Sequence, residues 1–99
     1  MTVYVDHAQI LYGRMKMNHM VADTPEELHA MAARIGVKRK WYQGPSKASF
    51  PHYDVCNEMR GLAIAYGAKH VSRKELAHFT RFKRMYWIAA GKTYEMLGW

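Results

Sequence analysis

The sequence predicts a small α/β domain in which helices pack on a mixed sheet of three to four strands, with a helical extension at the C-terminus. The chain has 99 residues, of which 49% are hydrophobic, and this length provides for one hydrophobic core. Short β-rich segments alternate with segments whose apolar residues recur at helical spacing, which is typical of a sheet covered by helices. No repeat, low-complexity tract or linker divides the sequence, so we expect a single domain.

The first third of the chain predicts two strands and a helix. Residues 2–5 are rich in β-forming side chains, and residues 15–22 alternate between two faces, as half-buried strands do. We expect a loop between them, over residues 7–14. The string Thr24-Pro25-Glu26-Glu27 combines a capping residue, a proline at the first helical position and a capping box. A helix therefore begins there, and Gly36 ends it.

The middle of the chain predicts a third strand and a second helix. Residues 41–43 are expected to form the strand, and the prolines, glycine and serines of residues 44–51 indicate a loop. We expect Asp54 to cap the helix that follows, because an aspartate side chain can accept hydrogen bonds from the first free N–H groups. Gly67 is expected to end this helix.

The C-terminal part predicts a short fourth strand and a long helix. Residues 68–71 suit the strand, and Ser72 with Glu75 forms a second capping box. The apolar spacing that follows indicates one long helix, or a helix pair if Gly91 breaks it. Residues 72–99 therefore form the basic helical extension of the domain.

The charge of the chain favours an anionic partner. Lys and Arg number 15 against 8 Asp and Glu, a net charge of +7. Residues 1–35 carry a net −1, whereas residues 36–70 and 71–99 each carry +4. A domain this basic commonly binds a nucleotide, a nucleic acid or another anionic partner.

The cellular setting expected from the sequence is the cytoplasm. Cys56 is the single cysteine, so no internal disulfide can form, and we expect it to be a small core residue. The first residues lack the basic and apolar regions of a signal peptide. No apolar run is long enough to cross a bilayer, so no membrane partner is expected.

Several short strings of residues together resemble one protein family. They are Val3-Tyr4-Val5-Asp6, the segment from Gly13 to His29 with its core Met15-Lys16-Met17-x-His19-Met20-x-Ala22-Asp23-Thr24-x-Glu26-Glu27-Leu28, Arg39-x-Trp41-Tyr42-Gln43, His52-Tyr53-Asp54-Val55, Arg60, and Gly67-Ala68. Over residues 2–71 the chain is similar to a small uncharacterised family, a domain of unknown function from bacteria and their phages. The resemblance implies a shared fold and a cytoplasmic bacterial or phage setting, and the family core spans residues 1–71.

Acidic and histidine side chains fall at the ends of the predicted elements. A carboxylate together with histidine can hold Mg²⁺ or Mn²⁺, activate a water molecule and polarise a phosphate oxygen for phosphodiester hydrolysis. We therefore take Asp6, His52 and Asp54 as candidate catalytic residues, and Asp6, His19 and Asp23 as candidate metal ligands.

Each of these residues also has a purely structural interpretation. Asp23 can belong to the turn before the first helix, Asp54 can be a helix cap, and His19 can be a half-buried strand residue. The first two strands are joined by too short a loop for a parallel crossover. An adjacent pair must therefore be antiparallel, which argues against a meeting of Asp6 and Asp23.

A phosphate-bearing ligand is the other candidate for the same region. Helix N-termini offer free N–H groups, basic side chains add charge-assisted hydrogen bonds, and aromatic rings can stack on a base. The candidate ligand-binding residues are Arg14, Lys16, Arg39, Trp41, Tyr53 and Arg60. The alternative is that the aromatic residues belong to the core and that the nearby carboxylates repel phosphate.

The C-terminal extension interleaves basic and aromatic residues. Such a helix can follow a nucleic-acid backbone, or it can be an amphipathic helix whose aromatic side chains cover the core. The candidate nucleic-acid-binding residues are Arg73, Lys74, Arg81, Lys83 and Arg84.

The sequence thus predicts a protein that binds a nucleotide or nucleic acid, with phosphodiester hydrolysis if a metal ion binds. The alternative is a non-enzymatic phage accessory or inhibitor protein that binds a host protein or sequesters a small signalling molecule. The first of these implies that polar residues at the element ends share one pocket. The expected members are His52, Tyr53, Asp54 and Arg60, with at least one of Asp6, His19 and Asp23.

Overall fold

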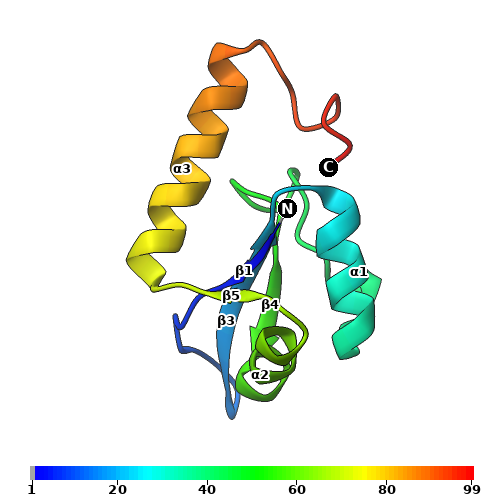
Figure 1. The fold of residues 1–99 in the computed structure, drawn as a ribbon, viewed down its shortest axis with the longest axis vertical. Helices are drawn as coiled ribbons and strands as arrows, with labels where there is room; N and C mark the ends of the chain where they lie inside the picture. The colour runs from blue at the N-terminus through cyan, green and yellow to red at the C-terminus, as the bar shows by residue number, and fades with distance from the viewer. Residues whose placement is uncertain (1) are drawn as a thin grey trace.

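The computed structural model describes residues 2–99, which form a five-stranded mixed sheet with three α-helices (Figure 1). In chain order the elements are β1 (Val3–Val5), β2 (Ile10–Tyr12), β3 (Met15–Ala22), α1 (Pro25–Ile35), the 3-10 helix η1 (Arg39–Trp41), β4 (Tyr53–Cys56), α2 (Asn57–Ala65), β5 (Lys69–His70) and α3 (Arg73–Ala89). The predicted fold class is confirmed. No helix within residues 2–99 is long and apolar enough to cross a membrane.

The strand β3 organises the sheet. Its N-terminal part pairs with β2 and its C-terminal part with β1, both antiparallel, while β4 pairs with its middle, also antiparallel. Met17 pairs with a residue of β2 and one of β4, and Met20 pairs with a residue of β1 and one of β4. The strand β4 therefore lies on the edge of β3 opposite to β1 and β2. The strand β5 joins β1 in parallel at the sheet edge.

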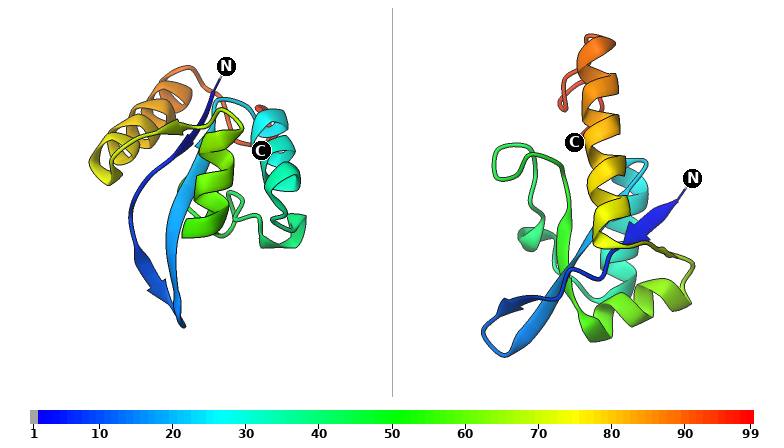
Figure 2. Two further views of the ribbon diagram at one scale, coloured as in Figure 1. Left: turned by 60° about the horizontal axis from the view of Figure 1, so that its bottom comes forward. Right: turned by 90° about the vertical axis from the view of Figure 1, so that its left-hand side faces the viewer.

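Alternation along the strands divides the side chains between two hydrophobic clusters. Val5 and Met20 face the main core, which α1 and α2 cover, as does Val55 of β4. Tyr4 and Val21 face the opposite side, where they pack with residues of α3. Figure 2 shows α1 and α2 together on one side and α3 apart from them. Successive side chains along a strand thus face the layer of α1 and α2 and the layer of α3 in turn.

The first helix forms as its sequence predicts. The Thr24 hydroxyl accepts a hydrogen bond from the Glu27 N–H, Pro25 occupies the first turn, and Gly36 ends the helix with a left-handed φ of 87°. Leu28 and Ala32 are buried against the sheet. The second capping box, at Ser72, is also present and begins α3.

Three local predictions in the first 56 residues are wrong. Residues 7–14 contain the strand β2, which forms a hairpin with β3 that extends beyond the helices (Figure 2). Residues 41–43 do not form a strand, because η1 occupies their start and only Gln43 makes an isolated bridge, to His52. Asp54 does not cap α2. It lies in β4, and Cys56 occupies the cap position.

The C-terminal residues fold back on the molecule. The helix α3 is continuous to Ala89, and Gly91 follows with a φ of 69°. Beyond it, Trp99 packs near Phe50 and Trp87, whose rings are stacked 5.5 Å apart. The extension is therefore packed on the domain through aromatic side chains, and the long loop before β4 provides part of that contact.

Candidate metal centre

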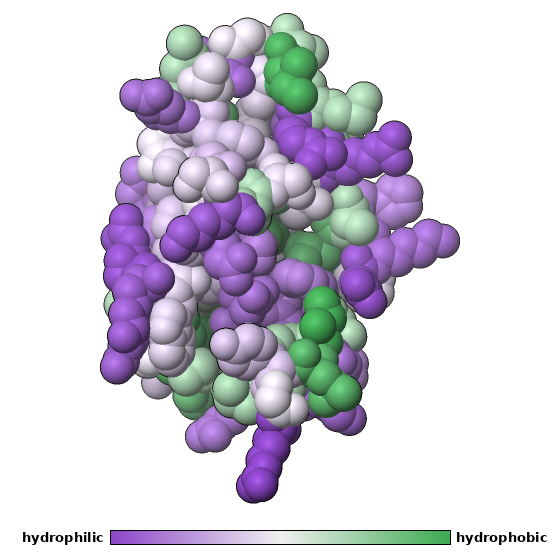
Figure 3. Space-filling model, turned by 180° about the vertical axis from the view of Figure 1, so that it is seen from behind, coloured by the Kyte–Doolittle hydropathy of each residue, from purple (hydrophilic) through white to green (hydrophobic). Residues whose placement is uncertain are grey.

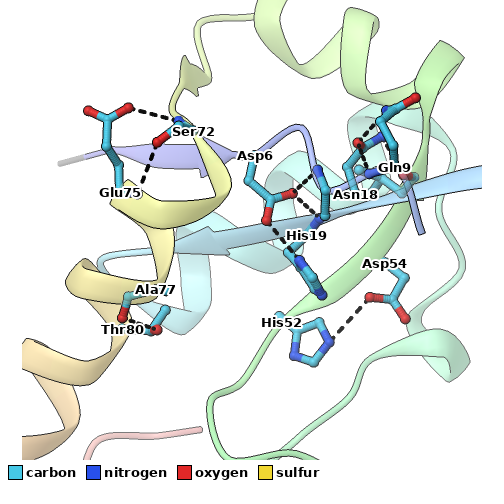
Figure 4. A network of polar contacts seen from close by, with 12 residues as sticks. Asp6, Gln9, Asn18, His19, His52, Asp54, Ser72, Glu75, Ala77 and Thr80 are labelled. Carbon is cyan, nitrogen blue, oxygen red and sulfur yellow. Dashed lines mark hydrogen bonds and ion pairs between the residues drawn. The ribbon is translucent and has the colours of Figure 1, made fainter.

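A row of polar side chains crosses the sheet on the side that faces α3. His19 of β3 is directly opposite Asp54 of β4, and the His19 carbonyl accepts a hydrogen bond from the Asp6 N–H after β1. Asp6 lies two residues after Tyr4, and His19 lies two residues before Val21. Because side chains two residues apart in a strand point to the same face, Asp6 and His19 face α3, as Tyr4 and Val21 do, rather than the main core. His52, two residues before Asp54, faces the same side because strand side chains alternate. Figure 4 shows these four residues close to one another, with α3 beside them at the left of the view.

Asp6 holds His19 in a fixed orientation. Asp6 is only 1% exposed, and its carboxylate accepts hydrogen bonds from the Ala8 N–H at 3.3 Å and the His19 N–H at 2.7 Å, while its second oxygen lies 2.8 Å from His19 Nδ1. Burial alone raises the pKa of Asp6, but these hydrogen bonds outweigh it and lower the pKa. The ionised carboxylate accepts the Nδ1 proton of His19, which leaves the lone pair of Nε2 available to a metal ion.

His52 is oriented by a backbone carbonyl. Its Nδ1 lies 2.8 Å from the Phe50 oxygen, to which it donates, and its Nε2 lies 3.3 Å from Asp54 Oδ1. Burial alone lowers the pKa of His52, but the hydrogen bonds to Asp54 and Phe50 outweigh it and raise the pKa. A metal ion bound here would replace the proton between His52 and Asp54, since imidazole nitrogen and carboxylate oxygen can both act as metal ligands.

Asp54 is held by a residue from the preceding loop. Its second oxygen accepts a hydrogen bond of 2.7 Å from Gln43 Nε2. The pKa of Asp54 is lowered, chiefly by the hydrogen bond from His52. Gln43 reaches this position because its isolated bridge to His52 aligns the loop beside β4. Asp54 is therefore an ionised carboxylate beside the two imidazoles.

His19, His52 and Asp54 together have the composition of a metal centre, and we name them the triad. Each offers one ligand atom, and these atoms lie within 4.8 Å of one another. The rings of His19 and His52 meet edge to face at 5.4 Å. Ligand bonds of about 2.0–2.2 Å would bring such atoms closer together, so a bound ion would require side-chain rotations in the triad. Two imidazoles and a carboxylate leave further coordination positions open, as in catalytic zinc sites and non-haem iron sites.

The choice of ligands favours a transition metal. Imidazole binds Zn²⁺, Fe²⁺ and similar ions, whereas Mg²⁺ prefers carboxylate, carbonyl and water oxygens. Of the two ions that the sequence suggests, Mn²⁺ therefore suits the triad better than Mg²⁺. Zn²⁺ suits it as well.

The turn that carries Asp6 is fixed by a network of side-chain amides. Residues 6–9 face only Asn18 and His19 on β3, so the chain bulges there, and Gln9 adopts a left-handed φ of 56°. Gln9 Nε2 donates to Asn18 Oδ1 at 2.7 Å and to Asn57 Oδ1 at 2.6 Å. Since Asn57 begins α2, the network ties the bulge to both β3 and α2 and so supports the carboxylate of Asp6.

The triad lies between two hollows. The larger, with a volume of about 550 Å³, we name the hairpin pocket; the β2–β3 hairpin forms one wall and the segment after α1 the other. The smaller, of about 220 Å³, we name the α3 hollow. His19 and His52 border both. The hairpin pocket is lined by Ile10, Leu11, Tyr12, Met15, Met17, Lys40, Trp41, Tyr42, Gln43, Lys47 and the triad.

The structure brings together part of the predicted site. Asp6, His19, His52 and Asp54 meet, with Asp6 behind His19. Asp6 follows the C-terminal end of β1, whereas Asp23 lies beside its N-terminal end, because β1 and β3 are antiparallel. The Asp23 carboxylate accepts hydrogen bonds from the Thr2 N–H and the Tyr4 hydroxyl. It is therefore not part of the centre.

The predicted ligand-binding residues are dispersed. Trp41 lines the hairpin pocket. Tyr53 is fully buried on the other face of β4, with its hydroxyl 2.8 Å from His29 Nδ1, so the expected convergence of Tyr53 with His52 and Asp54 does not occur. Arg60 donates from Nε to the Asp6 carbonyl at 2.6 Å and so supports the bulge. Arg14, Lys16 and Arg39 line neither hollow, although Arg39 lies 5.9 Å from the Tyr42 ring.

The basic residues of α3 also differ in position. Arg73 borders the α3 hollow, together with Leu76, Ala77 and Thr80 of the same helix. The other basic residues do not border it. They are Lys74 and Arg81, which are exposed, Lys83, which lies 5.7 Å from the Phe79 ring, and Arg84, which is half-buried.

Sequence reasoning missed Gln43, Lys40 and Lys47, as well as the apolar wall of the hairpin. The signal for the triad was nevertheless present. His52 and Asp54 are two residues apart, and this spacing places both on one face if the segment is a strand. If Asp54 instead begins a helix, as the sequence interpretation has it, the two-residue spacing does not place His52 and Asp54 on one face.

The chain matches the model of a known protein family. A family model described as "Protein of unknown function (DUF4031)" matches residues 3–83. The matched range includes the triad, Asp6 and Gln43, and it continues past residue 71 into α3, beyond the stretch that carries the resemblance noted from the sequence. No curated protein and no solved structure matches the chain.

Proposed function

The chain belongs to the DUF4031 family, whose description assigns no activity, so its own residues must indicate the function: we propose a metal-dependent hydrolase of phosphate esters. A divalent transition-metal ion binds to His19, His52 and Asp54. The phosphate-bearing ligand, a nucleotide or nucleic acid, enters through the hairpin pocket.

One observation carries the proposal: both imidazoles are oriented for metal binding by acceptors at Nδ1. Asp6 accepts from His19, and the Phe50 carbonyl accepts from His52. Histidine ligands of metals commonly donate their other N–H to a carboxylate or a backbone carbonyl, which fixes the tautomer and ring orientation. A purely structural histidine does not require a neighbouring histidine that is held in the same way at Nδ1, and here a carboxylate also lies within 4.8 Å of both imidazoles.

The surroundings of the triad support a phosphate ester as substrate. Lys40 and Lys47 line the hairpin pocket and neutralise an anionic group near the metal. A metal ion held by His19, His52 and Asp54 would activate water and polarise a phosphoryl oxygen. The water oxygen then forms a bond to phosphorus, the ester P–O bond breaks, and a proton passes to the leaving oxygen. The apolar wall of the pocket holds the organic part of the ligand.

Metal binding is the first step to test. Metal-stripped protein is titrated with Zn²⁺ and with Mn²⁺ by calorimetry, and we expect one ion per chain. His52→Ala and Asp54→Asn should lose affinity by more than the roughly 10–100-fold typical of an outer-shell change. His78→Ala is the matched control, because His78 is exposed on α3. Equal affinity in wild type, His52→Ala and Asp54→Asn contradicts the proposed site.

Hydrolysis is tested next with bis(4-nitrophenyl) phosphate, a small diester that carries no nucleobase and no second phosphate. The metal-loaded wild type should release 4-nitrophenolate, and His52→Ala should not. Tight metal binding without turnover of any phosphate ester instead favours the non-enzymatic alternative, a protein that binds or sequesters its ligand.

A further inference from the structure

We propose that the substrate of the triad is single-stranded nucleic acid, with one nucleoside in the hairpin pocket and the next phosphate in the α3 hollow. This inference rests on the proposed function and specifies its substrate. The nucleic-acid strand crosses the triad at the phosphodiester that is cleaved.

The two hollows give the triad access on two sides. His19 and His52 border both of them, so the same pair of imidazoles separates the hairpin pocket from the α3 hollow. A phosphate at the triad can therefore extend into both. A phosphomonoester has one organic substituent and needs one hollow, whereas a phosphodiester has two. Figure 4 shows α3, with Ala77 and Thr80, on the far side of His19 and His52 from Gln9 and Asn18.

The hairpin pocket suits an unpaired base. Tyr12, on the hairpin, is 71% exposed, and Trp41, in η1, is 52% exposed, and both line the pocket. Aromatic side chains exposed in this way can stack on nucleobases without regard to sequence. A volume of about 550 Å³ is within the range of small-molecule pockets. A base enters such a pocket only when it is not paired, which selects single strands.

The α3 hollow suits a phosphate. Arg73 borders it from the first turn of α3, and Ser49 and Thr80 add hydroxyl groups to its lining. Guanidinium binds phosphate through charge-assisted and often bidentate hydrogen bonds. Along α3 the lining of the hollow ends at Thr80, and Phe50, which also lines the hollow, stacks on Trp87.

The charges along this path are favourable for a polyanion. Within residues 2–99, the acidic residues that line the two hollows are Asp6 and Asp54, both of which belong to the metal centre. The basic residues along them are Lys40 and Lys47 on one side of the triad and Arg73 on the other. Seen from behind and coloured by hydropathy, basic and acidic alike, the molecule has long hydrophilic side chains projecting from both sides (Figure 3).

The test compares two substrates in the metal-loaded protein. One is bis(4-nitrophenyl) phosphate, which carries neither a nucleobase for the hairpin pocket nor a second phosphate for the α3 hollow. The other is a short oligothymidylate, whose binding is also measured by fluorescence anisotropy with a labelled strand. The quantity of interest is kcat/KM for the oligonucleotide divided by kcat/KM for the small diester.

We expect Arg73→Ala to lower this ratio about tenfold or more, since it removes a charge-assisted contact to phosphate. Trp41→Ala should lower it about 5- to 150-fold, as expected for the loss of one stacked base. Lys92→Ala, which removes an exposed positive charge after α3, should leave the ratio unchanged. Affinity for the labelled strand should fall in the first two variants and decrease strongly with added salt.

The outcomes separate this inference from the proposed hydrolysis. Cleavage of the small diester, with no strand binding or with an unchanged ratio in Arg73→Ala and Trp41→Ala, overturns the inference and leaves the hydrolase in place. Strand binding that depends on Arg73 and Trp41, without cleavage of either ester, overturns the hydrolase and leaves the ligand class in place. Absence of both cleavage and strand binding overturns both.

Discussion

Replacing Asp6 with asparagine should disrupt the metal centre without removing any ligand. The side chain keeps its size, but one carboxylate oxygen becomes an NH₂ group. Asp6 Oδ1 accepts from two backbone N–H groups, of Ala8 and His19. The amide oxygen therefore stays at that position, and the new NH₂ faces His19 Nδ1, which lies 2.8 Å away in the wild type.

The expected magnitude follows from this geometry. Two donors cannot share one hydrogen bond, so His19 must move its proton from Nδ1 to Nε2 and present Nδ1 to the amide. The proton then occupies the nitrogen that binds metal. Loss of an outer-shell partner of a metal-bound histidine typically lowers metal affinity about 10–100-fold, and we expect a reduction of that order for Zn²⁺ and Mn²⁺. Loss of the ionised acceptor should also lower the free energy of unfolding by about 1–3 kcal/mol.

Calorimetric titration and thermal unfolding of Asp6→Asn measure these two effects separately. Asp23→Asn is the matched control, because the Asp23 carboxylate also accepts hydrogen bonds from a backbone N–H and a side chain but lies at the opposite end of β1. This variant should lose stability and keep its metal affinity. Wild-type metal affinity in Asp6→Asn would refute the assigned orientation of His19.

Three further predictions concern the fold around the site. Burial, and then the positive charge of Arg39, lower the pKa of His29, so this side chain binds a proton more readily in the unfolded chain. The free energy of unfolding of wild type, relative to that of His29→Gln, should therefore fall as the pH decreases below about 6.5. A difference between the two proteins in urea denaturation that stays constant from about pH 8 to 5 would argue against this. Tyr53→Phe removes the hydroxyl beside His29 and should cost about 1 kcal/mol in urea denaturation, with unchanged Zn²⁺ affinity; a large loss of Zn²⁺ affinity would mean that Tyr53 acts in the site. Thr24→Ala removes the cap of α1 and should cost about 1 kcal/mol by thermal unfolding, and no change would show that the hydrogen bond to Glu27 is dispensable.

The sequence predicts best what is determined locally. The start and end of α1 follow from Thr24, Pro25 and Gly36, and each has the predicted role in the structure. The alternation in residues 15–22 correctly predicts a strand, and it also places Met17, His19 and Val21 on one face. Such features depend on backbone preference and short-range hydrogen bonds, which a single sequence contains.

The errors arise where the fold depends on distant partners. The residues of β2 are all exposed, so they show no alternation between buried and exposed positions, and their pairing with β3 alone makes them a strand. Asp54 resembles a helix cap because β4 is short and leads directly into α2. Its pairing with His19 depends on the register between β3 and β4, which are far apart in the sequence.

The partnership of Asp6 and His19 could be predicted only in part. Both were candidate metal-site residues from their chemistry, but their contact requires the bulge at residues 6–9, which turns the carboxylate toward the imidazole. That bulge is stabilised by Asn57 of α2, through Gln9. A sequence pattern around Asp6 alone contains no sign of this support.

X-ray absorption spectroscopy of the protein loaded with one equivalent of Zn²⁺ tests the central claim most directly. The account predicts a shell of nitrogen and oxygen ligands at about 2.0–2.2 Å, with the outer-shell scattering of two imidazoles, and the loss of one imidazole contribution in His52→Ala. A shell of oxygen ligands alone, or a spectrum that is the same in wild type and in His52→Ala, would contradict it.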